Sequence, residues 1–266
     1  MVSSTFNASS DFEAPQNSDL GLLPDPNLRD DSLTPEGIVP LTGKPPHYQA
    51  RRVLNALLNK NIPVMEYGAQ FVFRHGHTRE LMAYEWTIPD AQMEKASQIV
   101  QEHGFSLRTP DFRWDTSIQD IWLRREPDGD GNRWVHIHII PLSATFLTFE
   151  DAERAPSIID TDAMIHTPTP LKYMESLIKQ LIRIPAGEIC RGPFEEDLLG
   201  LIRSYVIRQH EPEICQVTRR QVIDSAYRRM ESWDWSNVGN GYDDILKELV
   251  EDPGFIEELT SDDPSF

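Results

Sequence analysis

Glu85 is the side chain best placed to do chemistry in this sequence. It lies in the strand-like run LMAYEWTIPD, residues 81–90, among apolar and aromatic neighbours. Because alternate residues of a strand face the same side, two acids spaced two residues apart can share a divalent cation. The residue at that spacing is Ala83, whose methyl group offers no ligand atom. The sequence therefore predicts a single carboxylate here, with a structural ion pair to Arg79 as the simpler alternative.

Two histidines, His136 and His138, lie two residues apart in the run VHIHII. A strand places both imidazoles on one face and Val135, Ile137 and Ile139 on the other. Such a pair suits a zinc or iron site if further ligands converge on it. The alternatives are a divalent-metal protein that uses both histidines and an unliganded pair on a half-exposed strand.

The motif Arg74-His75-Gly76 resembles the signature of the histidine phosphatases. In that family the motif ends a strand, and its histidine is a nucleophile that becomes phosphorylated. The resemblance implies that His75 carries the phosphoryl group while Arg74 and Arg79 neutralise it. The late His210 lacks the glycine that follows the second histidine of that family. A helix at this motif would exclude the phosphohydrolase alternative.

Strand and helix patterns alternate in the first half of the chain, and helical spacing dominates the second. The turn residues PDGDGN predict a hairpin between two strands. The predicted order is helix 47–61, strand 62–68, short helix 69–77, strand 81–89, helix 90–104, and hairpin strands 118–126 and 133–140. Helices over 167–184, 194–209, 216–230 and 242–250 follow. This order predicts an α/β half and then an all-helical half.

The same order resembles the nucleotidyltransferase fold, in a degenerate form of the uncharacterised fungal type. The resemblance is carried by Gly68-Ala69 after a strand, by Gly76 and Arg79, and by Ala83-Tyr84-Glu85 on the next strand. It covers about residues 46–184, including the later helical run PTPLKYMESLIKQLIR. It implies an α/β (α+β) fold: a mixed nucleotidyltransferase-like sheet flanked by helices, with a helical C-terminal half.

Active members of that family hold divalent metals with three acids, and the metals bridge the triphosphate and activate the attacking hydroxyl. Here the first acid is replaced by Ala83, and His136 or His138 stands at the place of the third. The resemblance therefore implies a degraded metal and catalytic site. We expect no cofactor, with magnesium only if the residual site is active.

The resulting expectation is a pseudoenzyme that binds an unknown small ligand or protein, although activity of the nucleotidyltransferase type stays open. No residue is assigned as catalytic or as a metal ligand. The tentative ligand-binding residues are Gly68, Ala69, Arg79, Glu85, His136 and His138.

The net charge of −18 is concentrated at the two ends of the chain. Residues 1–45 hold seven acids and two bases, and residues 243–266 hold nine acids and one base. A partner gripped through its phosphates needs clustered Lys and Arg, so nucleic acid is an unlikely partner. Residues 1–45 are also poor in large apolar side chains, which predicts a disordered tail.

Two cysteines, Cys190 and Cys215, and a polar, acidic start favour a reduced intracellular protein. Spanning a membrane takes about 20 consecutive apolar residues, and the sequence has no such run. We therefore expect a soluble, cytoplasmic protein that does not enter a membrane. The predicted organisation is a disordered acidic, Pro-rich tail over 1–45, an α/β core over 46–165, a helical region over 166–250 and an acidic tail over 251–266.

Overall fold

The computed structural model describes residues 45–77, 81–109, 120–125, 134–208 and 217–259. The tail predicted over residues 1–45 lies almost wholly outside this part of the chain, and so does Arg79. Among the described residues, no helix is both long enough and apolar enough to cross a membrane.

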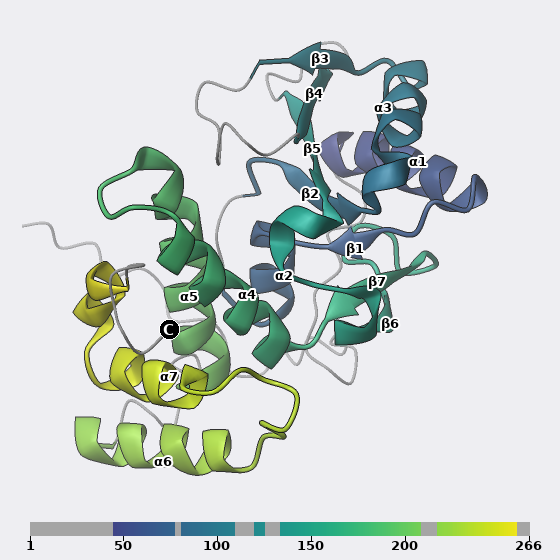
Figure 1. Ribbon diagram of the computed structural model, residues 1–266. Helices are drawn as coiled ribbons and strands as arrows, with labels where there is room; N and C mark the ends of the chain where they lie inside the picture. The colour runs from purple at the N-terminus through teal and green to yellow at the C-terminus, as the bar shows by residue number, and fades with distance from the viewer. Residues whose placement is uncertain (1–44, 78–80, 110–119, 126–133, 209–216, 260–266) are drawn as a thin grey trace, which may run out of the picture.

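The described strands form one mixed sheet in the order β3-β4-β5-β2-β1-β7-β6 (Figure 1). Their bounds are β1 Met65–Glu66, β2 Tyr84–Ile88, β3 Ser106–Arg108, β4 Ile121–Arg125, β5 Val135–Pro141, β6 Ala152–Pro156 and β7 Met164–Pro168. The β2–β5 and β1–β7 pairs are parallel, whereas the β1–β2, β3–β4, β4–β5 and β6–β7 pairs are antiparallel. The strand that carries Glu85, β2, therefore lies in the middle of the sheet.

Helices α1 (Pro45–Asn59) and α3 (Met93–Glu102) cover one face of this sheet. The apolar stripe of α1 is buried there with Tyr84, Trp86 and Ile88, the alternate residues of β2. Because neighbouring strand residues face opposite sides, this burial turns Glu85 to the other face. The alternation of β2 thus decides where its carboxylate lies.

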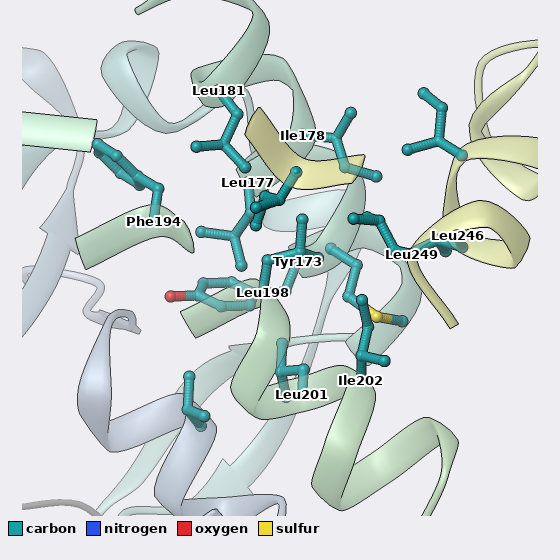
Figure 2. Packing of buried hydrophobic residues seen from close by; sticks show 14 of the residues in the cluster. Tyr173, Leu177, Ile178, Leu181, Phe194, Leu198, Leu201, Ile202, Leu246 and Leu249 are labelled. Atoms are coloured by element: carbon teal, nitrogen blue, oxygen red, sulfur yellow. The ribbon is translucent and has the colours of Figure 1, made fainter. Parts of the chain in front are cut away.

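The opposite face packs against α2 (Ala69–Arg74) and the helical half of the chain. That half comprises α4 (Pro170–Arg183), α5 (Gly192–Leu201), α6 (Arg219–Glu231), α7 (Tyr242–Glu251) and, continuing α5, a π-helix η5 (Ile202–Val206). Figure 2 shows Leu177 and Ile178 of α4 packed with side chains from α5 and α7. Thr169 caps α4 and Pro170 begins it, so the start of this helix is fixed by sequence.

Short 3₁₀ helices complete the described chain. They are η1 (Asp90–Gln92), η2 (Leu142–Thr145), η3 (Phe149–Asp151), η4 (Ile189–Arg191) and η7 (Pro253–Glu258). Ile256 in η7 and the following Leu259 are buried, and their carbonyl groups accept hydrogen bonds from the buried guanidinium of Arg191. The part of the acidic C-terminal segment that the structure describes is therefore packed onto the helical half.

The mixed sheet, its flanking helices and the helical C-terminal half confirm the predicted fold class. Strands β3, β6 and β7 were not predicted; the residues of β3 and β6 are largely exposed or polar, whereas β7 is short and mostly buried. The predicted boundary between residues 165 and 166 falls inside β7. The division into domains stays a prediction.

Candidate functional site

Gly68 brings the backbone close to the Glu85 carboxylate where β1 leads into α2. It has a φ of +62°, a conformation that glycine adopts without strain. A Cβ added at this position would lie 1.7 Å from Glu85 Oε2. The amide of Gly68 donates to the hydroxyl of Tyr173, 2.8 Å away, which ties the turn to α4. A glycine is therefore required here for two reasons, the backbone angle and the approach of Glu85.

The carboxylate of Glu85 is held from two sides. Its Oε2 accepts a hydrogen bond from the amide of Ala69 at 3.2 Å, and its Oε1 lies 3.3 Å from Nδ1 of His138. The parallel register of β2 and β5 sets Glu85 beside His138. The Glu85 side chain is 12% exposed, so little of it remains available to a ligand.

His138 links Glu85 to a second carboxylate, that of Asp120. Its Nε2 lies 2.8 Å from Asp120 Oδ2, and its side chain is fully buried. The indole of Trp122 stacks on the imidazole, with ring centres 3.9 Å apart and an angle of 19° between the planes. The indole N–H also donates to Asp120 Oδ2 at 2.9 Å. These four residues form one connected unit, which we name the carboxylate–imidazole chain.

The carboxylate–imidazole chain favours a charged imidazole on His138. Burial opposes the charge on both His138 and Asp120, but the hydrogen bonds and attraction between opposite charges outweigh it. The pKa of His138 is accordingly raised above its usual 6.5, and the pKa of Asp120 is lowered below its usual 3.8. A protonated imidazole donates through both nitrogens, which matches a carboxylate on each side. The geometry therefore favours a protonated His138 between the two carboxylates.

The tentative binding residues are brought together only in part. Gly68, Ala69, Glu85 and His138 converge, whereas Arg79 lies outside the described residues. His136 shares a face of β5 with His138, but its Nδ1 lies 3.4 Å from the guanidinium of Arg108 on β3. The expectation of a half-exposed pair is wrong for His138, which is fully buried.

Asp120 and Trp122 were missed by the sequence analysis, although the predicted hairpin contained the signal. Trp122 pairs with His138 in the antiparallel register of β4 and β5. Asp120 stands two residues before Trp122, and its position next to a strand with the same alternation brings it to the same face. Aligning the two hairpin strands around their turn would have identified both residues.

The phosphatase alternative is wrong, because its motif lies at the end of a helix rather than at the end of a strand. Arg74 is the last residue of α2, and His75 caps that helix. The guanidinium of Arg74 is bound to the buried Glu66, with Nε 2.5 Å from Oε2. Burial and then the charge of Arg74 lower the pKa of His75 to about 4. Its ring packs against Phe71 and Tyr205, so His75 serves the core.

The divalent-metal alternative lacks a ligand set in the part of the chain that the structure describes. No group of three or more His, Cys, Asp or Glu side chains there could hold a metal ion. His138 meets a carboxylate at each ring nitrogen, so neither nitrogen presents a free lone pair. His136 is directed to Arg108 instead.

Comparison with known proteins finds likeness in structure only. No protein-family model matches the chain, and no curated protein matches its sequence. An antigenic nucleotidyltransferase-like protein from Paracoccidioides brasiliensis is similar with a TM-score of 0.44 and 13% identity, over 71% of this chain and 94% of that one. The antibiotic-resistance factor ANT(2'')-Ia is similar with a TM-score of 0.38 and 12% identity, over 70% of this chain and 94% of that one. JHP933 from Helicobacter pylori is similar with a TM-score of 0.38 and 11% identity, over 80% of this chain and 88% of that one.

The chain is thus structurally similar, at low sequence identity, to nucleotidyltransferase-like proteins.

Proposed function

We propose that this protein is a nucleotidyltransferase-like pseudoenzyme, which binds a small ligand or a protein partner without transferring a nucleotidyl group. The observation that carries the proposal is the position of His138, bonded through one nitrogen to Glu85 and through the other to Asp120. An imidazolium between two carboxylates neutralises the groups that a divalent metal would need.

Nucleotidyl transfer depends on divalent cations held by several oxygen ligands. The family resemblance puts acids at position 83, at position 85 and at position 136 or 138. This chain has Ala83, Glu85 and two histidines there. A metal ion entering this site would meet a positive charge instead of the missing carboxylates, and like charges repel strongly when they are buried.

The other oxygen of Glu85 supports the same proposal. It accepts from the amide of Ala69, in a Gly68-Ala69 step that lacks the hydroxyl which commonly steadies a phosphate in the family that the sequence resembles. A carboxylate at this amide competes with a phosphate for the same donor. We propose that Gly68, Ala69, Arg79, Glu85, His136 and His138 border a binding face and not a catalytic centre. The reduced, cytoplasmic setting belongs to the same proposal.

Two assays test the proposal on the intact protein. The first is calorimetric titration with each nucleoside triphosphate in the presence of Mg²⁺ or Mn²⁺. The second follows release of pyrophosphate with candidate hydroxyl acceptors. We expect no pyrophosphate above the background without protein. Robust release that disappears in a Glu85→Gln variant would contradict the pseudoenzyme proposal.

A variant that rebuilds the missing ligands provides a matched control. The double substitution Ala83→Asp and His138→Asp removes the imidazolium and supplies carboxylates at both family positions. We expect this variant to bind Mn²⁺ by calorimetry and the natural sequence not to. Equal Mn²⁺ binding by both proteins would show that His138 does not block the site.

A further inference from the structure

A pocket of about 660 Å³ opens between η3 and the helical half of the molecule. It is lined by η3, by the start of α4, by Tyr205 of η5 and by the segment after α6 that contains Trp233 and Asp234. None of its lining residues belongs to the carboxylate–imidazole chain. Its volume falls within the range of roughly 300–1,000 Å³ that is typical of small-molecule sites.

Two aromatic side chains, Tyr205 and Trp233, form part of the wall. Their ring centres lie 5.9 Å apart with 27° between the planes. Tyr205 is carried by a π-helical turn, closed by a hydrogen bond of 2.7 Å from the amide of Ile207 to the carbonyl of Ile202. Single π-helical turns inserted into α-helices are frequent at functional sites. Neither ring is fully buried, and both line the pocket.

The carboxylates at the pocket differ in how they are paired. Lys172 is bound to Glu175 at 3.0 Å and to Asp151 at 3.6 Å, so its charge is already matched. Glu150 and Asp234 also line the pocket, and neither forms an ion pair with any residue that the structure describes. Hydrogen bonds from Ser236 lower the pKa of Asp234, which keeps that carboxylate ionised.

Two basic residues, Arg208 and Arg229, act on the aromatic wall from outside the pocket lining. The charges of Arg208 and Arg229 act on the hydroxyl of Tyr205, but neither side chain lines the pocket. Arg229 donates to the carbonyl of Val206. The lining therefore combines two aromatic rings with two carboxylates that have no ion-pair partner in the described chain.

We propose that this pocket binds a small organic cation, specifically one with a methylated ammonium group. Aromatic rings attract cations through the negative potential of their faces, and weakly hydrated ammonium groups lose little on leaving water. The carboxylates of Glu150 and Asp234 supply the opposite charge and disfavour anions. This site is separate from the proposed binding face around Glu85, so either can fail without the other.

Choline and its uncharged isostere, 3,3-dimethylbutan-1-ol, are the probes. They match in shape and differ in the charge of the head group. Titration at constant ionic strength, followed by calorimetry and by tryptophan fluorescence, should show choline binding at least about tenfold more tightly, because the cation–aromatic attraction is present only for choline. Equal affinity for the two probes, or no binding of choline up to tens of millimolar, would overturn the proposal.

Variants locate the site. Trp233→Leu should weaken choline binding about tenfold, and Asp234→Asn should weaken it several-fold with the fold intact, because Asp234 is exposed. Trp134→Leu is the matched control, since Trp134 is 40% exposed and lies under the guanidinium of Arg124, away from the pocket. Binding that survives Asp234→Asn unchanged, or that falls as much in the Trp134 variant as in the Trp233 variant, would contradict the assignment.

Discussion

Carboxylates are used in two different ways in this protein. In the sheet, Glu85 and Asp120 are largely buried, and a shared imidazole bonds to both. At the pocket between η3 and the helical half, Glu150 and Asp234 are exposed and form no ion pair with a described residue. The first pair is satisfied within the fold, whereas the second remains available to a ligand.

The difference follows from the energetics of burial. A buried carboxylate without a partner is strongly unfavourable, so it must be paired or neutralised. An exposed carboxylate is solvated by water and can stay unpaired until a cation arrives. Acidic residues near a cleft therefore indicate function only when their counter-charges have been identified. By this criterion the carboxylates of the sheet site are already paired, whereas Glu150 and Asp234 at the pocket can still pair with a ligand.

The largest effect should come from removing the cation of the sheet site. His138→Leu leaves two largely buried carboxylates without their common partner, and we expect it to lower the free energy of unfolding by about 3–5 kcal/mol. His136→Leu on the same strand face should change it by less than about 1 kcal/mol. Urea denaturation followed by circular dichroism measures both. Similar losses in the two variants would show that the carboxylate–imidazole chain does not stabilise the fold more than an ordinary strand histidine does.

A smaller loss should follow from Gly68→Ala. The added Cβ would collide with Glu85, and the alanine would have to adopt a left-handed backbone conformation. These two effects together should destabilise the fold by about 2–3 kcal/mol. Gly187→Ala is the control, because Gly187 has a φ of +87° with no atom within 4 Å of the added Cβ. The Gly187→Ala variant should lose about 1 kcal/mol of the free energy of unfolding, which is the conformational cost alone. Equal losses would contradict the close approach of Glu85.

The next effect in size should be the change in the free energy of unfolding with pH that His138 causes. Because its pKa is raised in the fold, its contribution is fully present below about pH 6.5 and is lost as the pH rises through the folded pKa. Asp120 has a lowered pKa, so its contribution is present above about pH 3.8 and is lost as the pH falls through its folded pKa. Each pKa unit corresponds to about 1.4 kcal/mol.

Subtracting the stability of His138→Leu from that of the natural sequence at each pH isolates this contribution. The subtraction is needed because His75 has a lowered pKa and acts in the opposite direction below pH 6.5. We expect the difference to be largest between about pH 4 and 6.5. A difference that grows above pH 7 would have the wrong sign.

The smallest effect should come from the pocket. Asp234→Asn removes an exposed charge without an ion-pair partner among the described residues, so the free energy of unfolding should change by no more than about 0.5 kcal/mol. Thermal and urea unfolding measure this change, and Asp120→Asn, expected to lose about 3 kcal/mol, is the comparison. A large loss at Asp234 would mean that this carboxylate supports the fold.

The sequence predicted those parts of the molecule that follow from local periodicity. The strand around Glu85, the hairpin that carries His138 and the helix at residues 170–183 show strong spacing patterns and are present. Strands β3 and β6 lie at the two edges of the sheet and bury little, so their sequences show no clear alternation.

The candidate site was predicted only in its separate pieces. Glu85 and His138 were chosen from their residue types, but their contact depends on the parallel pairing of β2 with β5 across 53 residues of sequence. The pocket was also missed, because it joins Tyr205 to Trp233 through the packing of helices.

The protonation of His138 is the most direct test of the account. Nuclear magnetic resonance titration of its imidazole, assigned by comparison with His138→Leu, gives the pKa in the folded protein. We predict a value above 6.5, unchanged by millimolar Mg²⁺ or Mg²⁺ with ATP, because the imidazolium stays between Glu85 and Asp120. A value below 6.5, or loss of the proton when Mg²⁺ is added, would contradict the claim that this site holds its own cation.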